Sequence, residues 1–203
     1  MKQPILKLTK IDVAEAQLKA AVHMFFNGGH PVPVYTIANA LREIVGKIGE
    51  LINVETTHRI LAAKNKEGAE KLKKTFDGIG GFFKHANHDA GDTIQLDEIF
   101  VEVALELACN DFARVTRGMP VEAQVYEAWV NAVTFEHISD VPPHKQHLIK
   151  NAIKLFPGVR DASTRAEQKT IGLRVMERAL QDRSLEMKIN RVVTLPSRER
   201  KNT

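Results

Sequence analysis

The residues best suited to chemistry stand together near the middle of the chain, at Lys84, His85, His88, Asp89 and Asp92. If one helix continues through Asp89, then His85, His88 and Asp89 occupy positions i, i+3 and i+4 and share a face. Two imidazoles and a carboxylate on one face suit a divalent metal ion of the facial-triad type, with Asp92 in support. Two alternatives stay open: Lys84 and His85 form a polar binding or catalytic patch, or they cap a helix end at the surface.

A glycine-rich segment with Gly78, Gly80 and Gly81 precedes these residues. In a helix each glycine costs roughly 1 kcal/mol relative to alanine, so either close packing of a neighbouring helix offsets the cost or the helix breaks there. A phosphate cradle is the weaker interpretation, because the spacing is not that of a Walker motif and no strand precedes it. Whether this segment is helix or loop decides whether the two histidines converge.

Two other acidic patterns are weaker candidates for chemistry. Glu55 and His58 match the Glu-x-x-His element of di-iron bundles, but such bundles need a second copy and the sequence has none. Glu98, Glu102 and Glu106 recur every four residues, and we interpret them as the solvent-facing side of one helix. The chain has no Gly-x-Ser-x-Gly, Cys-x-x-Cys or His-Glu-x-x-His motif, so these signatures of hydrolases, redox proteins and zinc proteases are excluded.

The elements that must position these residues are helices. Apolar residues recur at alternating spacings of three and four along most of the chain, and prolines and glycines separate the runs. Thr9 or Asp12 can cap the first helix, and Glu167 is placed as the capping-box partner of the last one. The fold class is therefore all-α, a single bundle of about six or seven helices. The pattern predicts helices at about residues 11–25, 33–51, 67–83, 96–115, 120–133, 144–156 and 164–180. In the helix at 144–156 the residues predicted to be buried are Leu148, Ile149, Ala152, Ile153 and Phe156.

The net charge of +4 is concentrated at the C-terminal end of the 203-residue chain. Residues 183–203 hold six cations and two anions, whereas residues 1–182 are neutral overall. We therefore divide the chain into a helical domain, residues 1–182, and a basic, flexible tail, residues 183–203. Such a tail suits RNA or another polyanion, and the alternative is a solvated terminus with no binding role. The cations are Arg183, Lys188, Arg191, Arg198, Arg200 and Lys201.

The single cysteine, Cys109, lies in an apolar helical run and is predicted to be a buried thiol. No disulfide within the chain is possible, which fits a reducing compartment. Residues 1–10 lack the apolar core of a signal peptide, and no run approaches the ~20 apolar residues of a membrane-spanning helix. We expect a cytoplasmic protein with no membrane partner.

Residues 81–87, Gly-Phe-Phe-Lys-His-Ala-Asn, resemble a central motif of a set of uncharacterised bacterial all-helical proteins. The two helices predicted before it also fit, so the resemblance covers about Lys10 to Thr116. In layout the chain is distantly similar to the HEPN superfamily of small helical bundles, many of which are RNA-directed toxins or defence proteins. HEPN ribonucleases use an arginine followed after four to six residues by a histidine, and this chain lacks that motif. The resemblance implies phosphate contact by Lys84 and His85 without the usual nuclease chemistry.

Three functions follow from these patterns, in order of preference. The first is a non-enzymatic helical protein that acts by self-association, as a homo-oligomer, or by binding a partner, because the helices have long apolar seams and catalytic signatures are missing. The second is a nucleic-acid-associated protein of HEPN-like layout. The third is a metal-dependent enzyme that uses His85, His88 and Asp89. No cofactor is predicted apart from the divalent metal of this third alternative.

Overall fold

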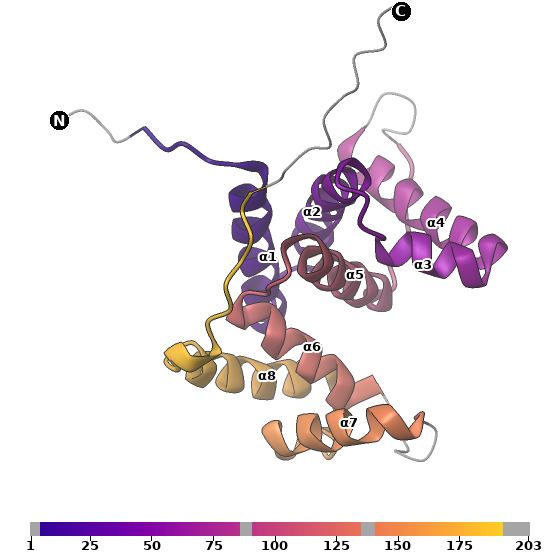
Figure 1. Cartoon of the computed structure of the whole chain (residues 1–203). Helices are drawn as coiled ribbons and strands as arrows, with labels where there is room; N and C mark the ends of the chain where they lie inside the picture. Colours follow the sequence, from indigo (N-terminus) through magenta and orange to yellow (C-terminus); the bar gives the residue numbers. More distant parts are fainter. Residues whose placement is uncertain (1–4, 86–90, 135–140, 193–203) are drawn as a thin grey trace, which may run out of the picture.

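Eight α-helices form the fold, in a computed structural model that describes residues 5–85, 91–134 and 141–192 (Figure 1). The all-α prediction is confirmed, and the described residues contain one helix more than the upper estimate. A short 3-10 turn, η2 (Arg183–Leu185), follows the last helix. The helices are α1 (Lys10–Phe26), α2 (Pro31–Leu51), α3 (Thr57–Lys64), α4 (Lys66–Lys84), α5 (Glu98–Thr116), α6 (Val121–Thr134), α7 (Pro143–Leu155) and α8 (Arg165–Ala179).

The additional helix is α3, which buries none of its residues. A helix without a buried face has no apolar stripe, so hydrophobic periodicity cannot reveal it. Its N-terminus is instead fixed by a distant residue, because the backbone N–H of Thr57 donates to the Asp111 carboxylate of α5 at 2.6 Å. The position of α3 therefore depends on a tertiary contact.

Both predicted helix caps are present. Thr9 is the N-cap of α1 and forms a capping box with Asp12, whose backbone N–H lies 3.1 Å from the Thr9 hydroxyl. Thr164 and Glu167 form the same arrangement at the start of α8. Each box satisfies backbone donors that have no partner within their own helix. These two boundaries are thus encoded locally.

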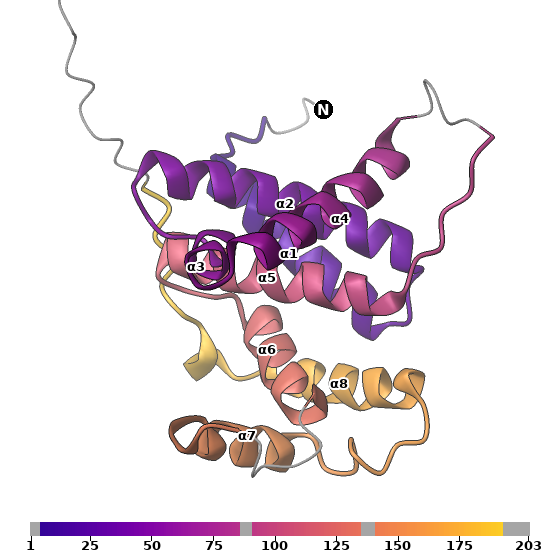
Figure 2. The ribbon, with the colours of Figure 1, turned by 90° about the vertical axis from the view of Figure 1, so that its right-hand side faces the viewer.

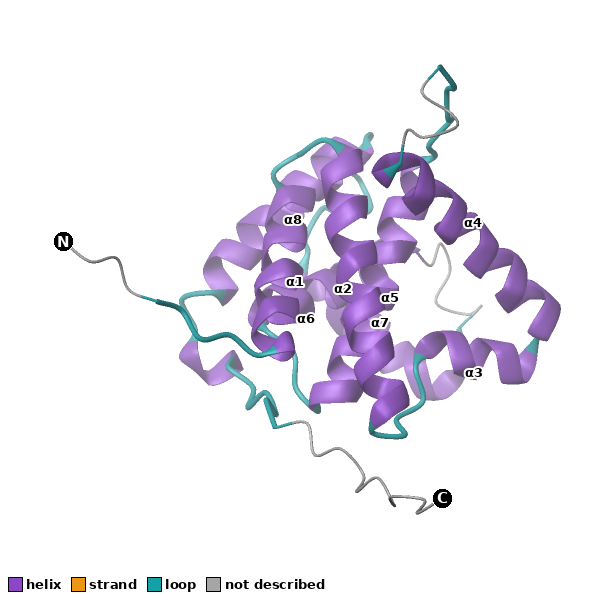
Figure 3. Ribbon diagram, turned by 90° about the horizontal axis from the view of Figure 1, so that it is seen from above, coloured by secondary structure: helices purple, strands orange, loops and turns teal. Residues whose placement is uncertain are grey.

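The helices are arranged around α1, α2 and α5. The most extensive packing is that of α2 against α5 and α1. Figure 1 and Figure 3 show α3 and α4 on one side of these helices, and Figure 2 shows α6 leading away from them towards α7 and α8. Within the described ranges, no helix combines the length and apolar character needed to cross a bilayer.

Four aromatic side chains form the centre of the core where α1, α6 and α8 meet. Trp129 and Tyr126 of α6 are stacked, with ring centroids 6.0 Å apart, and Phe25 meets both rings edge-on at 5.2 Å. Phe26 meets Trp129 edge-on at 5.7 Å. These offset and edge-to-face geometries are the favourable ones for aromatic pairs. The cluster therefore links the N-terminal helices to the C-terminal half of the chain.

The segment after α8 returns along the bundle. The Gln124 side chain donates to the Leu185 carbonyl, and the Asn190 backbone N–H donates to the Thr116 carbonyl, both at 2.9 Å. Arg191 forms ion pairs with Asp12 and Glu15 of α1. One of the cations assigned to the basic tail is therefore engaged by the bundle. Residues 193–203, with the three cations nearest the C-terminus, lie outside the described residues.

The contact between α8 and α1 gives a stability prediction. A Cβ at Gly172 would lie 2.2 Å from an atom of the buried Phe26 ring, so Gly172→Ala should lower the free energy of unfolding by about 1–3 kcal/mol. Gly78→Ala is the matched control, because a Cβ there meets nothing within 4 Å and should raise stability by about 1 kcal/mol. Urea denaturation measures both. Equal stability of the two variants would contradict this packing.

Candidate functional site

The sequence-predicted metal patch lies where α4 ends. Gly78, Gly80 and Gly81 are all helical, and α4 stops at Lys84. His85 is the C-cap and has an extended backbone, so the helix does not carry it onto a common face with residues further on. Asp92 is exposed in the following loop. His88 and Asp89 lie outside the described residues, and no described group of three or more His, Cys, Asp or Glu side chains is placed to hold a metal ion.

Lys84 and the glycines join α4 to α2. The Lys84 ammonium lies 2.9 Å from the Glu43 carboxylate of α2. A Cβ at Gly80 would lie 2.9 Å from the side-chain nitrogen of Asn39, so the glycine admits that buried amide. At Gly80 the described contacts match the close-packing interpretation of the glycine-rich segment. Lys84 and His85 do not converge on a shared cavity among the described pockets.

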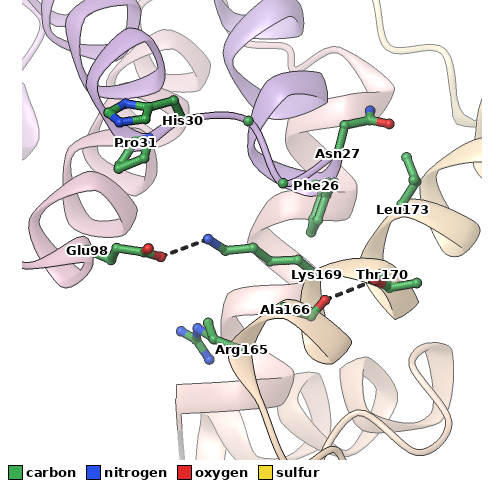
Figure 4. Close-up of a pocket in the computed structure, with 12 residues that line it drawn as sticks. Phe26, Asn27, His30, Pro31, Glu98, Arg165, Ala166, Lys169, Thr170 and Leu173 are labelled. Atoms are coloured by element: carbon green, nitrogen blue, oxygen red, sulfur yellow. Dashed lines mark hydrogen bonds and ion pairs between the residues drawn. The ribbon is translucent and has the colours of Figure 1, made fainter.

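A pocket of about 550 Å³ opens beside α8, between the loop joining α1 to α2 and the start of α5 (Figure 4). The Arg165 guanidinium forms two hydrogen bonds with the Glu102 carboxylate and lies 4.5 Å from the Trp129 ring centroid. Lys169 lies 3.0 Å from Glu98, as the dashed line in Figure 4 marks. Both cations in this pocket already have a carboxylate partner. The pocket is therefore a charged joint between helices, and its cations are not free for an anionic ligand.

The expectation that Glu98, Glu102 and Glu106 form a solvent-facing side is wrong for two of them. Glu102 is only 7% exposed, and Glu106 is half-buried. The physical reason is the central position of α5, which contacts α1, α2, α3 and α6. Carboxylates repeated every four residues suggest a solvent-exposed face, and this holds only when no other helix packs against that face. Here the same repeat faces α8 and α6, where Arg165 compensates one charge.

A groove of about 660 Å³ between α6 and α7 has the most exposed apolar side chains of any described pocket. Leu148 and Leu155 of α7 are 53% and 56% exposed, and Met187 is 50% exposed. The sequence pattern assigned Leu148 to the buried stripe of its helix, which is wrong. The helix buries Ile149 and Ala152 against α6 and leaves its flank uncovered. Exposed apolar surface in a concave groove is typical of a binding surface.

Two partly buried carboxyl groups lie on the α6 side of this groove. Glu127 lines the groove, and Glu106 of α5 is close enough to interact with the Glu127 charge. Burial raises the pKa of Glu127, which lines the groove, above its ordinary value. Burial, reinforced by the Glu127 and Glu102 charges, also raises the pKa of Glu106. Neither carboxylate has an ion-pair partner among the residues that the structure describes. The groove therefore holds partly desolvated negative charge that a cation can compensate.

The groove was not found from the sequence, although one signal bears on it. Over its 13 residues α7 has three lysines, two histidines and no acidic residue. A helix of one charge type with exposed leucines is typical of an interaction surface. Comparisons of the chain with protein-family models, with curated proteins and with solved structures give no match.

The joint in Figure 4 predicts unequal effects of two similar substitutions. Arg165→Met leaves Glu102 buried without a partner, so the free energy of unfolding should fall by about 3 kcal/mol. Lys169→Met leaves Glu98 largely in water, so its cost should be below about 1 kcal/mol. Chemical denaturation compares the two. A loss for Lys169→Met as large as that for Arg165→Met would contradict the assignment.

The raised pKa of Glu127 predicts a pH-dependent stability. Below the ordinary value of 4.5 the carboxyl is protonated in both folded and unfolded chains, and stability then falls as pH rises through the raised folded pKa. Glu127→Gln should therefore be more stable than the wild type near about pH 7, with the difference vanishing near about pH 4. Denaturation at low protein concentration measures this. Glu70→Gln, at an exposed position of α4, is the control, and an equal pH response in both variants refutes the prediction.

Proposed function

We propose that the protein acts by self-association, with α7 of one copy lying in the α6–α7 groove of another. The observation that carries the proposal is the uncovered pair Leu148 and Leu155 beside a groove of about 660 Å³. Two exposed leucines seven positions apart on a helix present one apolar stripe. Burying that stripe against a second copy removes it from water.

Charge complementarity supports a second copy as the occupant. The incoming α7 brings Lys145, Lys150 and Lys154, all exposed, and no acidic residue. The receiving groove offers Glu127, whose pKa is raised by burial, with Glu106 behind it. A lysine placed near these carboxylates supplies the cation that they lack among the described residues.

The same surface thus contains both the apolar stripe with its cations and the groove whose Glu127 receives one of them, although Arg117 also lines the groove. A self-complementary surface is what a twofold symmetric dimer requires, because each copy contributes the same residues to its partner. The proposal therefore assigns one interface to both copies. It describes a non-enzymatic interaction protein, in agreement with the first function inferred from the sequence.

The test is the oligomeric state in solution. We expect the wild-type chain to sediment as a dimer whose population rises with concentration, and Leu148→Glu and Leu155→Glu to shift it to monomer, because each places a charge in the apolar stripe. Leu51→Glu is the matched control, since Leu51 is 45% exposed at the end of α2 and lies outside the groove. Analytical ultracentrifugation measures all four proteins.

Circular dichroism establishes that each variant is folded, so that a monomer cannot result from unfolding. A wild-type chain that stays monomeric at millimolar concentration contradicts the proposal. A dimer that survives both groove substitutions also contradicts it, and dissociation of that dimer in Leu51→Glu would place the interface at the C-terminal end of α2 instead.

The two other functions inferred from the sequence rest in part on residues outside the described ranges. The metal site needs His88 and Asp89, and a polyanion contact by the tail needs Arg198, Arg200 and Lys201. Both stay predictions.

A further inference from the structure

Buried polar atoms without a hydrogen-bond partner are concentrated beside α3. Three of the four such side-chain atoms found in the described residues are Arg42 Nε, Thr57 Oγ1 and His58 Nε2. Arg42 and His58 line a cavity of about 280 Å³ between α2, α3, α4 and α5, and Thr57 is next to two of its lining residues. Buried polar groups are normally satisfied, so the unpaired atoms on two lining residues, Arg42 and His58, indicate that the cavity accepts a polar ligand.

Arg42 is the most unusual group in this cavity. Its guanidinium lies 4.6 Å from the centroid of the Phe76 ring, and its Nη1 donates to the Asn39 side chain at 3.3 Å. No described carboxylate lies within ion-pair distance of it. Burial lowers the pKa of Arg42 by more than the surrounding anions raise it, so its charge is incompletely compensated. The edge that carries Nε is left to donate to an oxyanion.

The carboxylates around the cavity already have donors. Because each is held elsewhere, none takes the place of a ligand on Arg42. They are Asp111, which accepts from the Thr57 backbone, Asp77, paired with Lys73, Glu43, paired with Lys84, and Glu50, paired with Lys47. Glu43, Glu50 and Asp77 are exposed and disfavour a long polyanion, since a nucleic-acid backbone passing over them meets like charge.

We infer that this cavity binds a phosphate monoester, whose phosphoryl oxygens accept hydrogen bonds from the Nε edge of Arg42 and the His58 imidazole. His58 lies in the first turn of α3, where the helix dipole favours an anion in addition to Asp111, which already accepts from the Thr57 N–H. A guanidinium edge and an imidazole N–H match two acceptor oxygens of a phosphoryl group. The volume of about 280 Å³ lies just below that of typical small-molecule sites, which fits a small ester.

The test is isothermal titration of the full chain with inorganic phosphate and with phenyl phosphate, at ionic strength fixed with sodium chloride. We expect both to bind, with phenyl phosphate the tighter, and both to raise the melting temperature. Arg42→Met and His58→Leu should each weaken binding roughly tenfold or more, because each removes a donor to a charged group. Arg183→Met, at an exposed arginine of η2, should bind as the wild type does.

Stability without phosphate separates a ligand site from a structural arginine. Arg42→Met keeps an unbranched side chain near Phe76 and removes the incompletely compensated charge, so it should be at least as stable as the wild type in phosphate-free buffer. If Arg42 has only a structural role, this variant is destabilised equally with and without phosphate, which overturns the inference.

Four other results would also overturn it. The first is no binding of either compound by the folded wild type. The second is unchanged binding in both Arg42→Met and His58→Leu. The third is inorganic phosphate binding as tightly as phenyl phosphate, which assigns the cavity to free phosphate. The fourth is displacement of phenyl phosphate by a short single-stranded RNA, which assigns the cavity to nucleic acid.

Discussion

The buried carboxylate of Glu102 constrains how the two halves of the fold meet. An ionised group removed from water is costly unless a partner with good geometry compensates it, and Arg165 provides two hydrogen bonds from a single guanidinium. That guanidinium also covers the face of Trp129, whose indole N–H donates to the Gln168 carbonyl. Because both Arg165 and Gln168 belong to α8, only one placement of α8 satisfies the acid and the indole together.

That placement has consequences further along the chain. With α8 fixed against α1 and α6, the segment after it returns to α1 and α5, where Asn190 and Arg191 are bonded. The helix before it, α7, makes its main contacts with α6 alone. A helix packed against one neighbour buries only part of its apolar surface, and Leu148 and Leu155 are the part left over. The groove therefore results from the same arrangement of α6, α7 and α8 that completes the core.

The fold could be predicted from the sequence wherever burial produces a pattern among residues that are close together in the chain. Seven helices were found because their apolar residues recur at spacings of three and four, and the caps at Thr9 and Thr164 depend on residues three positions apart. The prediction failed where burial depends on another element. Glu102 looks solvated until α8 covers it, Leu148 looks buried until α7 is seen to lack a second neighbour, and α3 has no stripe at all.

The candidate sites were less predictable than the fold for the same reason. Lys84 was singled out by its type and its neighbours, yet its partner Glu43 is 41 residues away. The cavity beside α3 combines Arg42 and His58 with Asp111, and no short spacing connects these three residues. Such a site exists only after α2, α3 and α5 have packed. Residue types alone therefore indicate which groups can do chemistry, whereas packing decides which of them meet.

Helix α5 connects these features physically. Its carboxylates are distributed along one rigid element, with Glu102 directed to α8, Glu106 towards α6 and Asp111 to the start of α3. Glu102 and Asp111 each hold a different neighbour through hydrogen bonds, whereas Glu106 is partly buried without such a partner. The cavity and the groove both lie beside the C-terminal half of α5, where Asp111 lines one and Ala113 lines the other.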